Sequence, residues 1–157
     1  MIDILFGFLI FASIFAILTS YFSSNYSSTR AQQLQTDLES KAFLAVDQLI
    51  RFEGIPNDWE SSASTIDDVN IVGLASGDRI IDENKLSRLS VFSSTDYNKL
   101  KQKLNIGQYD FLLELTGANI VSIGLSPVSE ATVVVVRRIV YYKGKEANIA
   151  FTLYELR

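Results

Sequence analysis

The side chains of this chain that could do chemistry are mainly carboxylates, and three loop-like stretches gather them. The clusters are Glu53, Asp58 and Glu60 around Trp59, then Asp67, Asp68 and Asn70, then Asp78, Asp82 and Glu83. None of them has the D-x-[DN]-x-[DN]-G spacing of a calcium loop. We therefore expect solvated loop carboxylates and no metal site.

Other catalytic machinery is excluded by composition. The chain has no Cys and no His, which removes thiol and Ser–His nucleophiles, histidine-bound zinc or haem, and imidazole acid–base catalysis. Gly73 and Gly77 are not followed by the Gly-Lys-Ser/Thr of a phosphate loop. We expect no enzyme, no catalytic residue and no cofactor. The net charge of -4 also argues against a nucleic-acid partner, because phosphate contacts need a basic surplus.

One candidate modification site lies near the N-terminus. Asn25-Tyr26-Ser27 has the acceptor pattern for N-glycosylation, which requires exposure outside the cell. The competing expectation for Asn25 is that neighbouring helices pack against this segment and keep it unmodified.

Charged residues are unevenly distributed along the 157 residues, and their distribution separates an uncharged N-terminal segment from a charged remainder. No residue from Ile4 to Thr29 is charged, and the remainder carries all 14 basic residues. Within this stretch, Ile4 to Phe22 is apolar almost throughout and has the length, about 20 residues, that a bilayer span requires. The remainder of the chain reads as soluble.

Three origins compete for this apolar segment. A secretory signal peptide is disfavoured, because no basic residue precedes the segment and no small-residue cleavage site follows it. A plain membrane anchor and a segment left at the tip of a mature protein after removal of a basic leader both remain open. Either origin places the rest of the chain outside the cytoplasm.

An amphipathic pattern continues the apolar segment. Apolar residues recur at three- and four-residue spacing at Leu34, Leu38, Ala42, Ala45 and Leu49. Gly54 and Pro56 then provide a left-handed cap and a helix stop. We expect one helix over 3–52; the alternative is two helices broken in the serine-rich stretch 23–29.

The remainder predicts an α+β protein with a small head. We divide the chain into an N-terminal helix, 1–53, and a β-rich head, 54–157; the helix comprises an apolar segment, 1–29, and an amphipathic extension, 30–53. The head is expected to hold an antiparallel sheet of about four strands and one or two short helices. The expected strands are 69–74, 79–81, 109–115, 119–124, 131–142 and 146–156, and the expected helices are 83–89 and 93–104, the second opened by a Ser93–Asp96 capping box.

Two further expectations concern the head. We expect Trp59 to cover the edge of its core. Arg137 and Arg138 interrupt a valine-rich strand, so one should point to each face of the sheet. One of the two arginines is expected to pair with a carboxylate such as Asp110 or Glu114.

At this point the residues carry a resemblance. The segment DILFGFLIFASIFAILTSYF, with its amphipathic extension and β-rich head, resembles archaeal type IV pilins, which are processed at a class III leader. Four head patterns are similar to a recurring arrangement in those proteins: Gly54-x-Pro56-x-x-Trp59, Ile71-x-Gly73-Leu74-Ala75, Lys85-Leu86 and Tyr109-Asp110-Phe111. The resemblance implies cleavage by a prepilin peptidase, extraction from the membrane by the pilus assembly machinery, and filaments with the helices at their core.

Physical chemistry leads to the same expectation, because a helix that is apolar all round needs lipid or other helices as partners. We expect a helical homopolymer, an extracellular filament on the cell surface with a role in surface adhesion, whose subunits are membrane-inserted before assembly. A single-pass membrane-anchored extracytoplasmic binding domain, or a minor pilin, is the alternative. Small residues at Gly7, Ala12, Ser13 and Ala16 either allow close helix approach or are incidental. The expected polymerisation residues are Ile4, Leu5, Phe6, Phe8, Leu9, Ile10, Phe11, Ile14, Phe15, Ile17, Leu18 and Phe22.

Overall fold

The computed structural model describes residues 2–117, 120–129 and 131–155, without the side chains of 2–5 and 24–28. The chain divides into two units, Met1–Asp37 and Leu38–Arg157. The helix α1, Ile2–Arg51, makes up the described part of the first unit and supplies the first element of the second. It runs without interruption through the serine-rich stretch, as the single-helix interpretation predicts.

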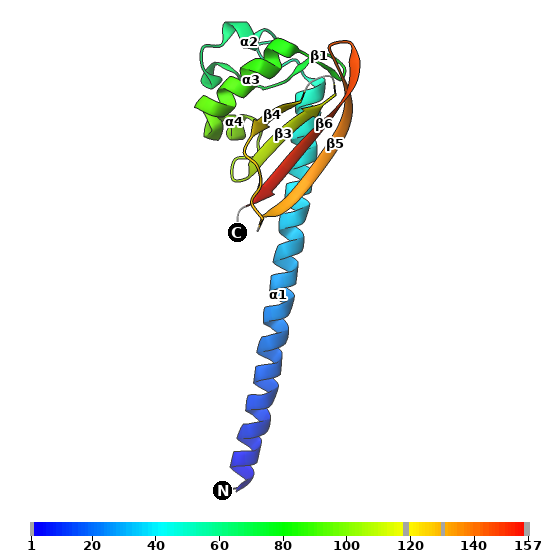
Figure 1. Ribbon diagram of the computed structural model, residues 1–157. Helices are drawn as coiled ribbons and strands as arrows, with labels where there is room; N and C mark the ends of the chain where they lie inside the picture. Colours follow the sequence, from blue (N-terminus) through cyan, green and yellow to red (C-terminus); the bar gives the residue numbers. More distant parts are fainter. Residues whose placement is uncertain (1, 118–119, 130, 156–157) are drawn as a thin grey trace. The chain divides into compact units, whose positions relative to one another are not determined.

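The second unit is an α+β head with one six-stranded, curled sheet (Figure 1). The strand order is β1-β2-β5-β6-β3-β4, and every neighbouring pair is antiparallel except β2 with β5. The strands are β1 Ala75–Gly77, β2 Ile80–Ile81, β3 Asp110–Thr116, β4 Val121–Gly124, β5 Thr132–Tyr142 and β6 Lys145–Glu155, and the other helices are α2 Trp59–Ser62, the 3-10 turn η1 Ile66–Asp68, α3 Glu83–Thr95 and α4 Tyr97–Lys103.

The α+β fold class is confirmed, with a correction to the sheet. The four strands β5, β6, β3 and β4 form the expected antiparallel part. The β1–β2 hairpin extends this part to six strands, and β2 runs parallel to β5, with Ile80 opposite Tyr141 and Ile81 opposite Tyr142. The sheet is therefore mixed. The sequence predicts a strand at 79–81, where β2 lies, but a strand this short has no side-chain periodicity from which its parallel neighbour could be predicted.

The segment 69–74 is not the strand that the sequence predicts. It makes a single bridge, between Ile71 and Ile55, and otherwise runs against the end of α1. The N–H of Leu74 donates to the carbonyl of Leu49 over 2.8 Å. The segment is apolar because it is buried against a helix, and its backbone finds partners there instead of in a ladder.

The two central helices also differ from the prediction. α3 continues to Thr95, so Ser93 lies inside it and does not begin a capping box. The N-cap of α3 is Asp82, whose carboxylate accepts from the N–H groups of Asn84 and Lys85 at 2.8 and 3.2 Å. α4 follows after Asp96 alone, where no side-chain cap bond forms.

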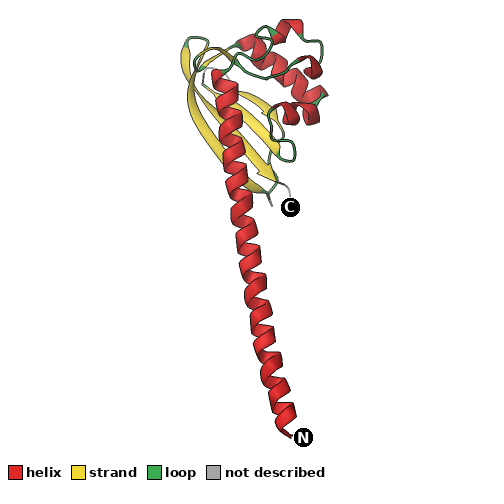
Figure 2. Ribbon diagram, turned by 180° about the vertical axis from the view of Figure 1, so that it is seen from behind, coloured by secondary structure: helices red, strands yellow, loops and turns green. Residues whose placement is uncertain are grey.

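The core of the head lies between the sheet and the second-unit part of α1, which crosses one face of the sheet (Figure 2). The helix positions that the amphipathic pattern singled out there are buried: Leu38, Ala42, Ala45 and Leu49. Alternate residues of β3 and β6 that share one face are buried as well, including Phe111 and Phe151, whose rings stack at 5.5 Å between centroids. The period of 3.6 in the helix and of 2 in the strands therefore produces one common core.

The end of α1 is held by the buried side chains of Trp59 and Lys85. Trp59 is fully buried, so the expectation that it covers the core's edge is wrong. Its indole N–H donates to the carbonyls of Glu53 and Gly73, at 3.2 and 3.0 Å. The ammonium of Lys85 donates to the carbonyls of Glu53 and Ala75, at 2.8 and 3.2 Å. These donors satisfy carbonyls that a helix end and a tight loop leave without partners.

The two arginines of β5 point to opposite faces and one of them lies beside a carboxylate, as expected, but this carboxylate is neither Asp110 nor Glu114. Arg137 is exposed, whereas Arg138 faces α1, with its Nε 3.8 Å from a carboxylate oxygen of Asp47. Asp110 instead pairs with Lys101, over 2.8 Å. β6 lies between β5 and β3, so the carboxylates of β3 are two strands away from either arginine, about 10 Å.

Candidate assembly surface

The side chains of the apolar segment of α1 are exposed from Phe6 to Ser23. The described large apolar residues from Phe6 to Phe22 have exposed fractions between 48% and 69%. The predicted polymerisation residues among them are Phe6, Phe8, Leu9, Ile10, Phe11, Ile14, Phe15, Ile17, Leu18 and Phe22. The side chains of Ile4, Leu5 and Asn25 lie outside the described residues, so the glycosylation prediction remains a prediction.

This part of α1 has no polar face. Four consecutive residues, Phe8, Leu9, Ile10 and Phe11, are large, apolar and exposed. Because successive helix positions are rotated by about 100°, these four side chains point all round the helix. An amphipathic surface helix would leave one side polar, so this segment needs apolar surroundings on every side.

The hydroxyl groups within the segment do not change this character. Ser13 Oγ donates to the carbonyl of Leu9 over 2.8 Å, and Thr19 Oγ1 donates to the carbonyl of Phe15 over 2.8 Å. Both hydroxyls therefore have a partner in the helix itself. They can enter an apolar environment without the cost of an unsatisfied polar group.

Length and composition make the segment comparable to a membrane span. Residues Phe6–Ser23 form a helix long and apolar enough to cross a bilayer, and none of this window is buried inside the molecule. A helix of this kind at an N-terminus is typical of a membrane anchor or a signal sequence.

Gly7 is the one glycine of the segment, and no contact within the chain requires it. A Cβ atom at this position would meet nothing within 4 Å. A glycine inside a helix costs about 1 kcal/mol relative to alanine. Close approach of another helix is a use for Gly7 that contacts within the chain do not supply.

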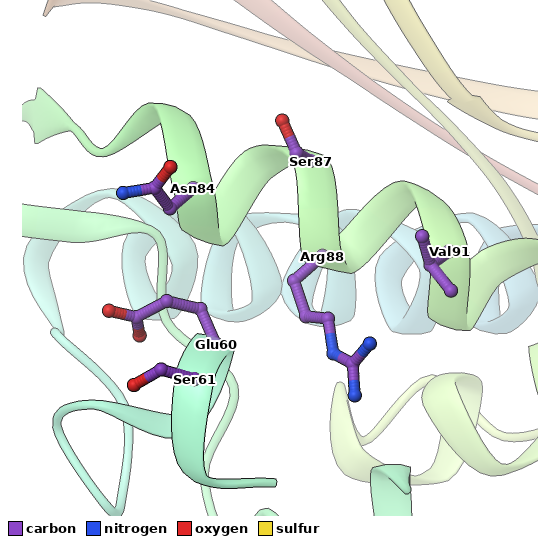
Figure 3. A pocket seen from close by; sticks show the side chains of 6 residues that line it. All are labelled: Glu60, Ser61, Asn84, Ser87, Arg88 and Val91. Carbon is purple, nitrogen blue, oxygen red and sulfur yellow. The ribbon is translucent and has the colours of Figure 1, made fainter. Parts of the chain in front are cut away.

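The head has a polar hollow of about 580 Å³ between α2 and α3. Its lining side chains are Glu60, Ser61, Asn84, Ser87, Arg88 and Val91 (Figure 3). The carboxylate of Glu60 and the guanidinium of Arg88 lie apart and do not converge on one point (Figure 3). Nη2 of Arg88 donates to the carbonyls of Ala63 and Ser64, at 2.6 and 3.1 Å. The hollow therefore holds no acid–base pair.

A second hollow, of about 350 Å³, lies beside the end of α1. Exposed Leu44 and Phe52 line it, and the amide of Gln48 donates to the carbonyl of Val72 over 2.9 Å. Most of its wall is apolar and its amide is already bonded to the backbone, and the carboxylate of Asp47, which also lines it, lies 3.8 Å from Nε of Arg138.

The ion pair between Lys101 and Asp110 is largely buried, and the ring of Tyr97 lies against it. The ammonium of Lys101 lies 5.2 Å from the centroid of the Tyr97 ring. Burial raises the pKa of Tyr97 well above its ordinary value, and the Tyr97 hydroxyl accepts from the N–H of Phe111 over 3.0 Å. A tyrosine held in its neutral form with a backbone partner is a structural group.

None of the acidic clusters forms a metal centre. Across the described residues, no three acidic side chains come close enough together to hold an ion. Asp68 forms local hydrogen bonds within its own loop: its carboxylate accepts from the N–H and the hydroxyl of Thr65 at 2.9 and 3.2 Å. Asp82 caps α3.

One surface was missed in the sequence analysis. Val133, Val135, Ile139 and Tyr141 are all exposed on the outer face of β5, on the side away from α1. The run of four valines was the available signal, because a strand with one solvated face alternates apolar and polar residues.

The comparisons with known proteins add no relative: no protein-family model, no curated protein and no solved structure matches this chain.

Proposed function

We propose that this chain is the structural subunit of an extracellular type IV pilus-like filament. The observation that carries the proposal is the α1 segment from Phe6 to Phe22, apolar and exposed on every side. Copies of this helix pack together in the filament core. The assembled filament stands on the cell surface and serves adhesion, and each subunit is held in the membrane by the same helix before assembly.

Energetics support self-assembly through this helix. Burying one Phe, Leu or Ile side chain contributes about 1.5–3 kcal/mol. Summed over the segment, the gross contribution is on the order of tens of kcal/mol, which exceeds the roughly 4–15 kcal/mol that association costs in lost freedom. A contact repeated head to tail, without closing on itself, produces a filament instead of a ring.

A second function is supported by the same helix. A single-pass membrane anchor with an extracytoplasmic binding head needs one apolar span and a folded soluble part. The two functions differ in what covers the helix in the mature protein, which is lipid for the anchor and other helices for the filament.

The experiment compares shear-released material with detergent-extracted membrane from cells that make the protein. Negative-stain electron microscopy and N-terminal sequencing of the 17.6 kDa band test the filament directly. We expect filaments in the sheared fraction, with the band in the same fraction. The band in membranes alone, with no filaments, contradicts the proposal and favours the anchored head.

A variant pair sharpens the test. Ile10→Lys places a charge in the middle of the apolar surface and is expected to abolish filaments. Ser90→Lys places the same charge on the exposed side of α3, in the head, and is the matched control. Equal filament yields from the two variants would rule out the apolar helix as the polymerisation element.

A further inference from the structure

Besides the apolar segment of α1, the chain has a second surface without a partner, which is the open edge of β5 in the head. The N–H of Tyr141 donates to the carbonyl of Arg79 beside β2, over 2.8 Å, so the backbone groups of Tyr141 face away from β6. Backbone groups alternate between the two sides of a strand, so those of the odd-numbered residues 133 to 139 face the same way.

β2 covers only the last part of this edge. It pairs with Tyr141 and Tyr142 and no further. Over residues 132–140, no described strand lies beside β5 on the side away from β6, and no backbone hydrogen bond joins this edge to another described segment. An open strand edge is a template for pairing with a further strand.

The side chains along this edge have the character of a central strand. Val133, Val135 and Ile139 are exposed on the outer face, while Val136 and Val140 are buried on the inner face. Strands that are apolar on both faces are normally covered on both. Thr132–Tyr142 also contains no proline, glycine or acidic residue, and these are among the features that keep edge strands apart.

We propose that β5 pairs edge to edge and antiparallel with β5 of a second copy of this chain, centred on Val135. The pairing joins two six-stranded sheets into one through a two-fold axis, so each edge meets an identical one. This contact goes beyond the assembly through α1, because it lies between heads and does not use the apolar helix. Since a two-fold contact joins antiparallel copies, it links subunits of neighbouring filaments and not subunits of one head-to-tail filament.

Charge excludes the register centred on Arg137. Pairing centred on Arg137 would place two guanidinium groups directly opposite each other, which is destabilising. Pairing centred on Val135 places Val135 opposite its own copy and Arg137 opposite Val133 of the second copy. Within the described residues no carboxylate pairs with Arg137. Its charge is therefore not neutralised by a neighbour, and it disfavours the register in which two copies of Arg137 lie opposite each other.

Arg138 limits the strength of the pairing. Its Nη1 donates to the carbonyl of Arg137 over 3.0 Å, and its guanidinium lies 5.0 Å from the Phe43 ring centroid. That carbonyl faces the open edge and keeps a second lone pair for a partner strand. A guanidinium beside the edge makes the pairing reversible, so the heads remain separate at low concentration.

Disulfide trapping in the full chain tests the proposal, since the native sequence has no Cys. Single-cysteine variants Val135→Cys, Val133→Cys and Ser90→Cys are purified in excess detergent, with at most one chain per micelle, and oxidised. In the proposed register the two Cα atoms at position 135 are about 5.5 Å apart, within disulfide range. Those at position 133 are about 13 Å apart, out of range. Ser90, exposed on α3, reports random collisions.

We expect Val135→Cys to give far more covalent dimer than either other variant. Equal yields from Val135→Cys and Ser90→Cys overturn the proposal, and so does preferential trapping through Val133→Cys, which indicates another register.

A charge exchange in the Val135→Cys background provides a second, independent readout. Val133→Glu places a carboxylate opposite Arg137 of the second copy, and Val133→Lys places a like charge there. Because each dimer contains two such pairs, we expect the Glu variant to dimerise about tenfold more readily than the Lys variant, with a difference that shrinks in salt. Both substitutions lie on an exposed face, and thermal melting checks that the fold is unchanged. Equal dimerisation of the two variants overturns the proposed register.

Discussion

The indole N–H of Trp59 donates a hydrogen bond to the carbonyl of Gly73 over 3.0 Å, joining the start of α2 to the segment that precedes β1. Lys85 donates to the neighbouring carbonyls of Glu53 and Ala75. Three of the sequence patterns singled out in the head, those containing Trp59, Gly73 and Lys85, therefore meet at one place. They hold the end of α1 against the remainder of the head.

Trp59→Phe tests the contribution of this hydrogen bond. The substitution keeps an aromatic ring beside Phe92, whose centroid is 6.0 Å away, but leaves the carbonyl of Gly73 without its donor, whereas the carbonyl of Glu53 keeps the ammonium of Lys85. We expect the free energy of unfolding to fall by about 1–3 kcal/mol, measured by urea denaturation of the full chain in detergent. Tyr141→Phe removes a polar group from an exposed ring and is the control, with no measurable change expected.

Gly73→Ala tests close packing of the same junction. A Cβ atom at Gly73 would overlap the backbone carbonyl of Phe52, which cannot move without displacing the end of α1. We expect a loss of about 3 kcal/mol or more. Gly107→Ala is the matched control, because a Cβ there meets nothing within 4 Å. Comparable losses in the two variants would contradict this account of Gly73.

Asp68 gives the head a pH dependence of stability. Hydrogen bonds from Thr65, above all from its backbone N–H, lower the pKa of the Asp68 carboxyl below its usual 3.8. A carboxyl whose pKa is lower in the folded state adds stability above its unfolded pKa and loses it as the pH falls through the folded pKa. We expect wild type to be more stable than Asp68→Asn at neutral pH. The difference should shrink once the pH drops below about 3.8, as thermal melts from pH 7 to pH 2 would measure. A constant difference across that range would contradict the mechanism.

Thr19→Val tests whether helix hydroxyls contribute to assembly. Because Thr19 Oγ1 already donates to the carbonyl of Phe15, neighbouring helices need not supply it with a partner. We expect Thr19→Val to assemble with wild-type yield and filament melting temperature, in contrast to Ile10→Lys. Filaments weakened by the valine would indicate that the hydroxyl bonds between subunits.

The features that depend on local sequence periodicity were predictable. The apolar segment of α1, its amphipathic continuation, and β3, β5 and β6 each carry a repeat of 3.6 or 2 residues that one window of sequence displays. Gly54 marks the helix end as predicted and adopts a φ of 99°. The prediction of a strand at 69–74 was wrong for a related reason. A short apolar run indicates that the segment is buried, but not whether it pairs in a sheet or packs against a helix.

The sequence by itself determined the α+β class and an N-terminal helix that is apolar on every side, because both follow from which residues repeat along the chain. Only the tertiary structure decided that Trp59 and Lys85 meet at the end of α1, that Arg138 faces Asp47, and that β5 keeps an open edge. These relationships join residues far apart in the chain, and they depend on strand order and on which backbone groups remain unpaired. Neither the strand order nor the set of unpaired groups can be read from any single segment of the sequence.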